Sequence, residues 1–298
     1  LLSLVGIFGN TMIIVVLAHH GFKDTTSTMM RSLAVSDLIY FLTDSFYNVG
    51  CIALMFDRAL GQTLNVINGM YFFYWNQMSL TVSLCTVAVI AVEKAIAVYF
   101  PFHVSRLFTP LRIKIILVLI YVCNFSDMII WAFTHNMIYL TNLSNNETFF
   151  TLVLSEFHQN NYELVLFLST VIFSHLLYTV PLAIVVLCSA MISFKMIRIS
   201  KSALTASKSR PQNIKGFKVI KLLLAVSIVT LIVCLPTAIV EMYVRYGPDG
   251  RDISNSFVYL TQLITTLLYQ IVGAANFFLY LTMNTKFARS CKTILCCV

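Results

Sequence analysis

Seven long apolar stretches, separated by short polar segments, constrain what this chain can fold into. A helix needs about 20 apolar residues to cross the hydrocarbon core of a bilayer, and each stretch is long enough for one crossing. Only 11% of the 298 residues are charged, against about 25% in a soluble domain. The pattern excludes a soluble enzyme, a disordered chain and a secreted disulfide scaffold as first interpretations. It predicts an all-α membrane protein, a seven-transmembrane helix bundle. The expected spans are 1–18, 28–53, 67–99, 111–135, 164–194, 217–243 and 256–283.

The predicted bundle, residues 1–283, is followed by a short segment, 284–298, with basic and apolar residues at helical spacing. This pattern is typical of an amphipathic helix that lies in the membrane interface, here the eighth helix. Two cysteines at its end, Cys296 and Cys297, are expected to be palmitoylated, and free thiols are the alternative. Because Leu1 already lies inside an apolar stretch, we expect a trimmed chain with further segments at both ends.

Basic residues collect in alternate loops. One set of loops holds 15 of the 20 Lys and Arg residues, and the other set holds three. The basic set consists of segments 19–27, 100–114, 195–221 and 284–298. Cytoplasmic loops are the basic ones, so the N-terminus is expected outside the cell, as seven crossings require. Because the positive charges collect in these loops, the net charge of +8 gives no support for a nucleic-acid partner. Segment 195–221, with eight Lys or Arg residues, can meet anionic membrane lipid, a G protein or a kinase, and a solvated cytoplasmic loop is the alternative.

The loop 136–163 contains no Lys or Arg but has two glycosylation sequons. They are Asn142-Leu-Ser and Asn146-Glu-Thr, which predict glycans on Asn142 and Asn146. Glycans are added on the extracellular side, and the charge count places this loop there. The two observations agree on the orientation of the chain.

Four polar residues fall near the middle of four different stretches: Asn10, Asp37, Ser83 and Asn276. Polar groups at membrane depth are costly, so they usually face the bundle interior. If these four face one another, their oxygens suit a small hard cation with water. The alternative is a structural hydrogen-bond cluster that joins helices. Spacing alone favours this alternative.

Asp44 follows Asp37 by seven residues, two helical turns along the same face and about 10 Å closer to the outside. A second buried carboxylate there can anchor a cationic ligand, or it can be neutral or hydrated through an outer vestibule. Other polar and aromatic residues at similar depth can line one outward-open cavity. These are Asn76, Gln77, Glu241, Tyr269 and Gln270. A membrane-interface belt is the alternative for the aromatic residues.

Two prolines, Pro181 and Pro236, lie inside the fifth and sixth stretches. Each removes a backbone hydrogen bond and is expected to bend its helix. A bend near mid-membrane gives a helix a pivot, which a conformational switch needs. Membrane helices also carry prolines for purely structural reasons.

Six short motifs carry a resemblance that covers essentially the whole chain. They are Gly9-Asn10, Ser32-Leu-Ala-Val-Ser-Asp37, Glu93-Lys94-Ala95, Pro181, Cys234-Leu-Pro236 and Asn276-Phe-Phe-Leu-Tyr280. In this order, on seven spans, they resemble the rhodopsin-like G-protein-coupled receptors. The segment ending at Asp37 is the most specific match, because it is close to the second-helix signature.

The resemblance implies a function and a role for individual residues. In the family, residues matching Asn10, Asp37, Ser83 and Asn276 form a sodium and water network that collapses on activation. Agonist binding in the outer cavity favours an outward movement of the inner end of the sixth helix, which opens a groove for a heterotrimeric G protein. The chain is thus expected to be a plasma-membrane receptor, not an enzyme, with no cofactor besides an allosteric sodium ion. The signalling residues that match family motifs are Glu93, Lys94, Pro181, Cys234, Pro236 and Tyr280.

Several positions depart from the family pattern. Lys94 replaces the usual Arg, and a lysine is a point charge without the fork of a guanidinium. Cys234 stands where a Trp is usual, so the common aromatic toggle is absent. Asn76 stands where amine receptors keep an Asp, which argues against a standard biogenic-amine pocket. Gly69 takes the place of the outer third-helix Cys, so the usual disulfide cannot form.

The loop from Phe100 to Pro110 resembles that of invertebrate chemosensory and FMRFamide-like peptide receptors. This resemblance implies an extracellular peptide or an environmental small molecule as the ligand. A cationic ligand is still possible, because it can pair with Asp44 on the second span in place of an acid on the third.

Two other functions compete with the receptor interpretation. A transporter or ligand-gated channel needs a polar path through the membrane, and nothing polar continues inward of Asp37 except the end that carries Glu93. A membrane enzyme needs a metal cluster or a nucleophile with its base, and the seven spans contain no such motif. The receptor interpretation is therefore preferred.

Overall fold

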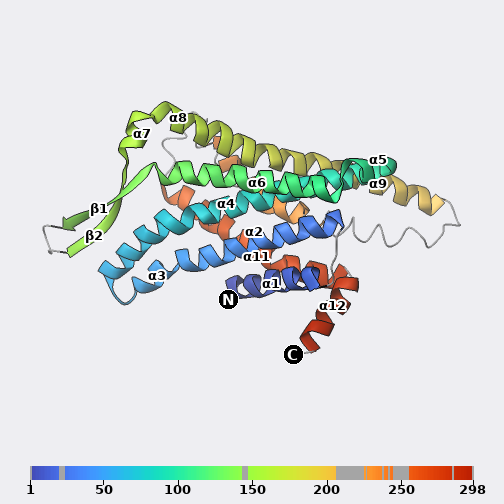
Figure 1. The fold of residues 1–298 in the computed structure, drawn as a ribbon, viewed down its shortest axis with the longest axis horizontal. Helices are drawn as coiled ribbons and strands as arrows, with labels where there is room; N and C mark the ends of the chain where they lie inside the picture. Colours follow the sequence, from blue (N-terminus) through green and yellow to red (C-terminus); the bar gives the residue numbers. More distant parts are fainter. Residues whose placement is uncertain are drawn as a thin grey trace.

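The computed structural model describes residues 2–19, 24–142, 147–205, 225, 227–236, 238–240, 242–243, 255–283 and 285–296. Long helices lie side by side along the long axis of the molecule (Figure 1). Five of the long elements are α1 (Leu2–His19), α2 (Thr25–Tyr47), α4 (Arg58–Tyr99), α6 (Pro110–Ala132) and α11 (Asn255–Met283). A further long helical run is continuous through α8 (Tyr162–Phe167), η1 (Leu168–Thr179) and α9 (Val180–Thr205). Residues 227–236 and 238–240 are helical and belong to the sixth predicted span.

Shorter elements lie at the two ends of this bundle. One end carries α3 (Val49–Ala53) and the strands β1 (His135–Asn142) and β2 (Glu147–Leu154), and we call it the hairpin end (Figure 1). The other end carries α5 (Pro101–Leu107) and is called the α5 end. The remaining short helices are α7 (Glu156–Asn160) and α12 (Thr285–Cys296).

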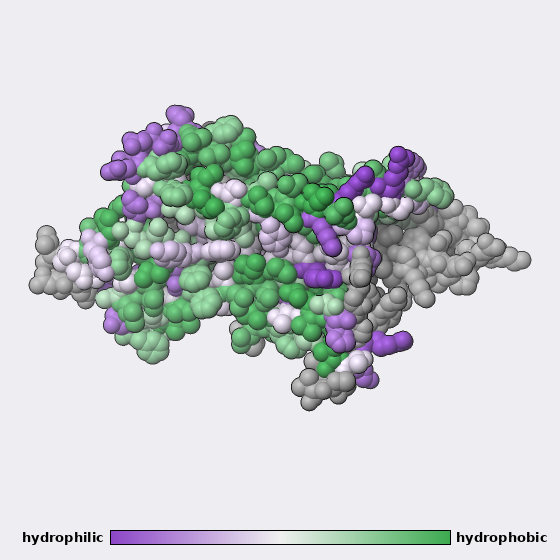
Figure 2. Space-filling model, viewed as in Figure 1, coloured by the Kyte–Doolittle hydropathy of each residue, from purple (hydrophilic) through white to green (hydrophobic). Residues whose placement is uncertain are grey.

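Apolar side chains cover the long sides of the molecule, and hydrophilic ones gather mainly at its two ends (Figure 2). Within the described residues, five helical segments are long and apolar enough to cross a membrane. These are Leu2–His19, Arg58–Tyr99, Pro110–Ile130, Tyr162–Arg198 and Leu263–Thr282. Ser227–Val240 is a shorter apolar helix. The more polar α2 carries the two acidic residues Asp37 and Asp44.

Aspartate caps define where α2 and α4 begin. The Asp24 carboxylate accepts a hydrogen bond from the backbone N–H of Ser27, 3.1 Å away, and Asp57 accepts one from Leu60 at 3.0 Å. Such caps satisfy backbone donors that the first helical turn leaves free. The cap at Asp57 starts α4 well before the expected boundary at residue 67. A helix of 42 residues is about 63 Å long, about twice the thickness of a hydrocarbon core.

An antiparallel hairpin occupies part of the loop 136–163, which the sequence reading left without structure. Its register runs from the pair His135–Leu154 to the pair Asn142–Glu147. The rings of Tyr139 and Phe150 pack across it in a tilted arrangement, with centroids 4.0 Å apart. Both strands are rich in Thr, aromatic and aliphatic residues, which favour strands, and this composition is the signal that could have found them.

The fifth helical segment contains a twelve-residue π-helix, η1, directly before Val180 and Pro181. Its hydroxyl side chains follow the wider π register: Ser174 donates to the carbonyl of Ser169 at 3.2 Å, and Thr179 donates to that of Ser174 at 2.7 Å. The thiol of Cys85 on α4 donates to the Leu177 carbonyl at 3.5 Å. Proline has no N–H to continue the ladder, and π-turns are frequent at functional sites. The sequence predicted a bend at Pro181 but not this wide turn.

Candidate functional site

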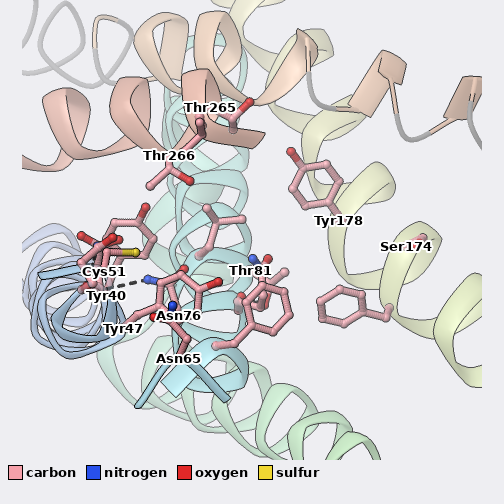
Figure 3. Close-up of a pocket in the computed structure, with 17 residues that line it drawn as sticks. Tyr40, Tyr47, Cys51, Asn65, Asn76, Thr81, Ser174, Tyr178, Thr265 and Thr266 are labelled. Atoms are coloured by element: carbon pink, nitrogen blue, oxygen red, sulfur yellow. Dashed lines mark hydrogen bonds between the residues drawn. The ribbon is translucent and has the colours of Figure 1, made fainter. Parts of the chain in front are cut away.

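A pocket of about 390 Å³ lies between α2, α4, η1 and α11, in the half of the bundle nearer the hairpin end (Figure 3). Tyr178 and Ser174 on η1 face Tyr40 and Asn76 across it (Figure 3). The walls are aromatic, amide and hydroxyl side chains, which is the mixture expected of a small-molecule site. The polar residues in the wall are Tyr40, Asp44, Tyr47, Asn48, Asn65, Asn76, Gln77, Thr81, Ser174, Tyr178, Thr265 and Thr266.

Asp44 is the one charged side chain among the described residues that line this pocket. The residue is only 4% exposed. Its carboxylate accepts a hydrogen bond from the Gln270 side chain on α11, with 2.6 Å between Nε2 and Oδ2. The neighbouring Asn48 amide bonds instead to the backbone carbonyl of Asp44, at 2.8 Å. No basic side chain in the described part of the chain pairs with Asp44.

The other residues predicted for the outer cavity occupy four different kinds of position. Asn76 and Gln77 line the pocket, and Asn76 donates to the Tyr40 carbonyl at 3.5 Å. Gln270 reaches the site through its bond to Asp44. Tyr269 does not line the pocket, because one residue of helical rotation, about 100°, separates it from Gln270 and directs its hydroxyl toward Asp37. Glu241 lies outside the described residues.

Asp37 is the centre of a second, nearly closed site, and it is 1% exposed. Its carboxylate accepts hydrogen bonds from Ser83 on α4 at 2.8 Å and from Asn276 on α11 at 2.9 Å. The Tyr269 hydroxyl approaches the same carboxylate at 3.5 Å. The structure therefore brings together three of the four polar residues that the sequence singled out. Three helices meet at this one acidic group.

The fourth residue, Asn10, bonds to backbone instead. Its amide nitrogen donates to the carbonyls of Gly6, at 2.9 Å, and Gly273, at 3.4 Å. The side-chain oxygens of Asn10 and Asn276 are buried and accept no hydrogen bond from the described residues. Buried oxygens without donors are costly unless water or an ion satisfies them. A cavity of about 10 Å³ beside Asp37, Ser83 and Asn276 has room for about one water-sized particle. These oxygens fit a small hard cation.

Two tyrosines separate the pocket from the Asp37 site. Tyr40 lines the pocket and Tyr269 lines the small cavity, and their rings pack edge to face with centroids 4.6 Å apart. Both side chains are buried in one hydrophobic cluster with Phe41 and Val233. The two buried carboxylates on α2 therefore lie in different surroundings.

The wall of the pocket is joined to the sixth span. The Tyr178 hydroxyl on η1 donates to the backbone carbonyl of Cys234 at 3.2 Å. Cys234 is buried, and Pro236 follows two residues later in the same helical run. The sequence pointed to Pro181, which is also buried, but it missed Tyr178. The spacing of a tyrosine three residues before Pro181 is the signal that could have found it.

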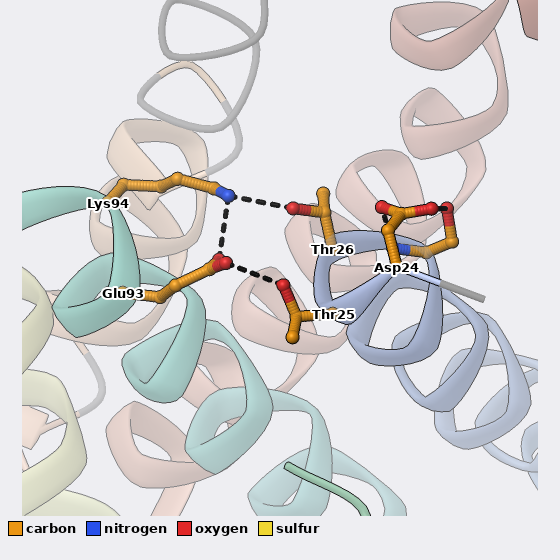
Figure 4. Close-up of polar contacts among 6 residues, drawn as sticks. Asp24, Thr25, Thr26, Glu93 and Lys94 are labelled. Atoms are coloured by element: carbon orange, nitrogen blue, oxygen red, sulfur yellow. Dashed lines mark hydrogen bonds and ion pairs between the residues drawn. The ribbon is translucent and has the colours of Figure 1, made fainter. Parts of the chain in front are cut away.

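An ion pair lies at the α5 end of α4 (Figure 4). The Lys94 ammonium is 2.6 Å from the Glu93 carboxylate, and both residues are buried. Lys94 also donates to the Thr26 hydroxyl at 2.8 Å, and the Thr25 hydroxyl donates to Glu93 at 2.9 Å. Because both threonines begin α2, the pair joins α4 to α2. Thr25 and Thr26 fall in segment 19–27, which the sequence predicts to be a loop, so this contact is not predicted.

The remaining predicted residues occupy varied positions. Tyr280 is buried near Phe287 of α12, with ring centroids 6.1 Å apart, and its hydroxyl has no hydrogen-bond partner among the described residues. Asn142 ends β1, and Cys296 ends α12. Asn146 and Cys297 lie outside the described residues.

Comparisons with known proteins give one match. The family model described as 7 transmembrane receptor (rhodopsin family) matches residues 9–280. No curated protein matches the chain. The match begins within α1 and ends within α11, and it confirms the predicted seven-helix membrane bundle.

Proposed function

Because this chain belongs to the rhodopsin family of seven-transmembrane receptors, we propose that it binds an extracellular ligand and activates heterotrimeric G proteins. Members of this family are multi-pass membrane receptors and not enzymes. One observation supports the proposal most strongly: Tyr178, in the wall of the pocket, bonds to the backbone of the sixth helical span. The ligand site and the element that must move therefore touch.

We place the hairpin end outside the cell and the protein in the plasma membrane. The three loops expected outside hold only three of the 20 Lys and Arg residues. Asn142, at the end of β1, belongs to one of the two predicted glycosylation sequons. Cys296, which ends α12, and Cys297 would carry lipid anchors beside the membrane.

The ligand is proposed to be a neuropeptide or a chemosensory small molecule. A pocket of about 390 Å³ lies at the small end of the range for small-molecule sites. It has room for a small molecule or for the terminal residues of a peptide. The loop from Phe100 to Pro110 is the part of the chain that favours an invertebrate chemosensory or FMRFamide-like subtype.

Sodium is proposed to bind beside Asp37. The side-chain oxygens of Asn10 and Asn276 are buried and accept no hydrogen bond from the described residues, and the cavity that Asn276 lines beside Asp37 has the size of one small particle. A sodium ion or water there would satisfy these oxygens. The ion would favour the arrangement in which α2, α4 and α11 stay close together.

G-protein binding is proposed at the α5 end. Phe102 on α5 is 92% exposed, which offers an apolar contact for a partner protein. In the inactive state the Glu93–Lys94 pair holds α4 against Thr25 and Thr26. Ligand binding would weaken the bond between Tyr178 and Cys234 and allow the inner end of the sixth helix to move outward. This is a shift between pre-existing states.

Nucleotide exchange tests this proposal without knowledge of the ligand. The purified chain in lipid nanodiscs is mixed with each class of heterotrimeric G protein, and guanine-nucleotide exchange is measured. We expect exchange above that of the G protein alone, raised severalfold by Glu93→Gln because the ion pair with Lys94 is lost. The matched control, Glu156→Gln on exposed α7, should leave the rate unchanged.

Transmembrane current is recorded from the same nanodisc preparation after transfer to planar bilayers. No exchange with any G-protein class, for either the wild type or Glu93→Gln, would contradict the receptor proposal. A steady current in that case would support the alternative of a divergent seven-helix transporter or ligand-gated channel.

A further inference from the structure

We propose that the pocket is built for an organic cation whose charged group pairs with Asp44. This inference rests on the proposed function, since it names the class of ligand that the same pocket takes. Asp44 is buried, and no cationic side chain pairs with it within the described part of the chain. Buried carboxylates are costly unless a positive charge or several hydrogen bonds compensate them. Here the ligand supplies the charge.

The hydrogen bonds already made leave room for this partner. A carboxylate has about four lone-pair sites. The Gln270 side chain donates to this carboxylate, with 2.6 Å between Nε2 and Oδ2. Asn48 directs its amide to the backbone of Asp44. The Gln270 bond fixes the direction of the carboxylate and leaves acceptor capacity toward the pocket that Asp44 lines.

The rest of the wall fits the body of such a cation. Tyr40, Tyr47, Phe73 and Phe173 line the pocket, and aromatic faces attract ammonium and guanidinium groups. On α4, Asn76 is neutral and donates to the Tyr40 carbonyl. The charged group of the ligand would therefore pair with Asp44 on α2, which Gln270 of α11 orients. Helix α4 contributes amides and hydroxyls to the wall. The same chemistry is found in a free amine and in the lysine side chain of a peptide.

Cys51 provides a direct probe, because this exposed free cysteine lines the same pocket as Asp44. Two methanethiosulfonate reagents of similar size are compared on the purified full chain. One carries a trimethylammonium group and the other a sulfonate. After each rate is divided by its rate with a free thiol, we expect the cation to react with Cys51 about tenfold or more faster, because a nearby carboxylate attracts it. The Cys51→Ser protein gives the background.

Removing one acidic charge at a time shows which carboxylate causes the preference of Cys51 for the cationic reagent. Asp44→Asn should reduce the preference for the cationic reagent at least about fivefold, whereas Glu156→Gln, which removes an exposed acid outside the pocket, should leave it unchanged. Equal rates for both reagents at wild-type Cys51 would overturn the proposal, and this result needs no variant to fold. An unchanged preference in a folded Asp44→Asn protein would overturn it as well.

Protection of Cys51 then identifies the source of the cation. Tyramine is compared with its neutral isostere tyrosol, and a glycyl-lysyl-glycine amide with its side-chain-acetylated form. Protection by a cationic member but not by its neutral partner supports the proposal, and the pair that protects identifies a free amine or a peptide. Equal protection by charged and neutral partners, or none by either cation, overturns it. These measurements involve no G protein, so their failure is distinct from failure of nucleotide exchange.

Discussion

The two buried carboxylates of α2 have the same chemistry but different surroundings. Asp37 accepts hydrogen bonds from Ser83, Asn276 and Tyr269 beside a cavity of about 10 Å³. Asp44, seven residues later, accepts one from Gln270 and lines a pocket of about 390 Å³. Burial alone does not separate them, since both are almost fully buried. The number of donors and the adjacent free volume do, and on these differences rest the proposed ionic role of Asp37 and the proposed ligand role of Asp44.

The largest expected difference between the two sites is in stability. Asp37→Leu leaves Ser83, Asn276 and Tyr269 buried without their acceptor, so we expect a loss of about 3 kcal/mol in the free energy of unfolding. Asp44→Leu takes the acceptor away from Gln270 and should cost about 1 kcal/mol. Unfolding in mixtures of mild detergent and SDS measures both. Equal losses would show that the two sites do not differ in this way.

Sodium should act at one site only. If its concentration exceeds its dissociation constant tenfold, sodium stabilises the protein by about 1.4 kcal/mol relative to potassium or choline. Asp37→Asn should abolish this stabilisation, and Asp44→Asn should retain it. The unfolding midpoint in each salt is the measurement. A sodium effect that survives Asp37→Asn would exclude the proposed ion site.

The link from the pocket to the sixth span should have a smaller effect. Tyr178→Phe keeps the ring in the pocket wall but removes the bond to the Cys234 carbonyl, which is worth about 1 kcal/mol. Hydrogen exchange of the amides in 227–240 should then rise about fivefold, and ligand-free nucleotide exchange should rise with it. Tyr71→Phe, an exposed tyrosine on α4 outside the pocket, is the control. If the amides of 227–240 exchange at the wild-type rate, Tyr178 does not hold this helix.

The smallest effect concerns the hairpin. Burial, with a contribution from His158, lowers the pKa of His135 below its ordinary 6.5. The folded state thus favours the neutral ring, so its contribution is intact above pH 6.5 and is lost as the pH falls below that value. Between pH 7.5 and 5.5 we expect β1 to lose a few tenths of a kcal/mol of protection in hydrogen exchange, after correction for intrinsic rates. His135→Gln should remove this dependence, whereas exposed His103→Gln should not.

The membrane fold was accessible from the sequence because one physical constraint dominates it. A span needs a long apolar run, and such runs are visible without any structure. The side-chain clusters depend on how each helix is rotated about its axis, and the sequence predicts this rotation only in part. Spacing placed Asp37, Ser83 and Asn276 at similar depth, but it did not show that Tyr269 faces Asp37 while Gln270 faces Asp44. One residue of helical rotation, about 100°, separates these two roles.

Other features depend on partners far away in the chain. The Tyr178–Cys234 bond joins a side chain to a backbone carbonyl 56 residues later, and no local pattern encodes it. Thr25 and Thr26 precede the apolar run, so the pattern predicts them in a loop. The cap at Asp24 instead starts α2 at Thr25. The hairpin was overlooked because short strands give a weak periodic signal beside long apolar runs.

The division of roles between Asp37 and Asp44 is tested most directly by infrared difference spectroscopy of their carboxylates in the purified chain. We predict two separate responses. Replacing potassium with sodium should shift a carboxylate band that disappears in Asp37→Asn, and adding tyramine should shift a band that disappears in Asp44→Asn. A single band that responds to both cations, or a sodium response that disappears only with Asp44, would contradict the account.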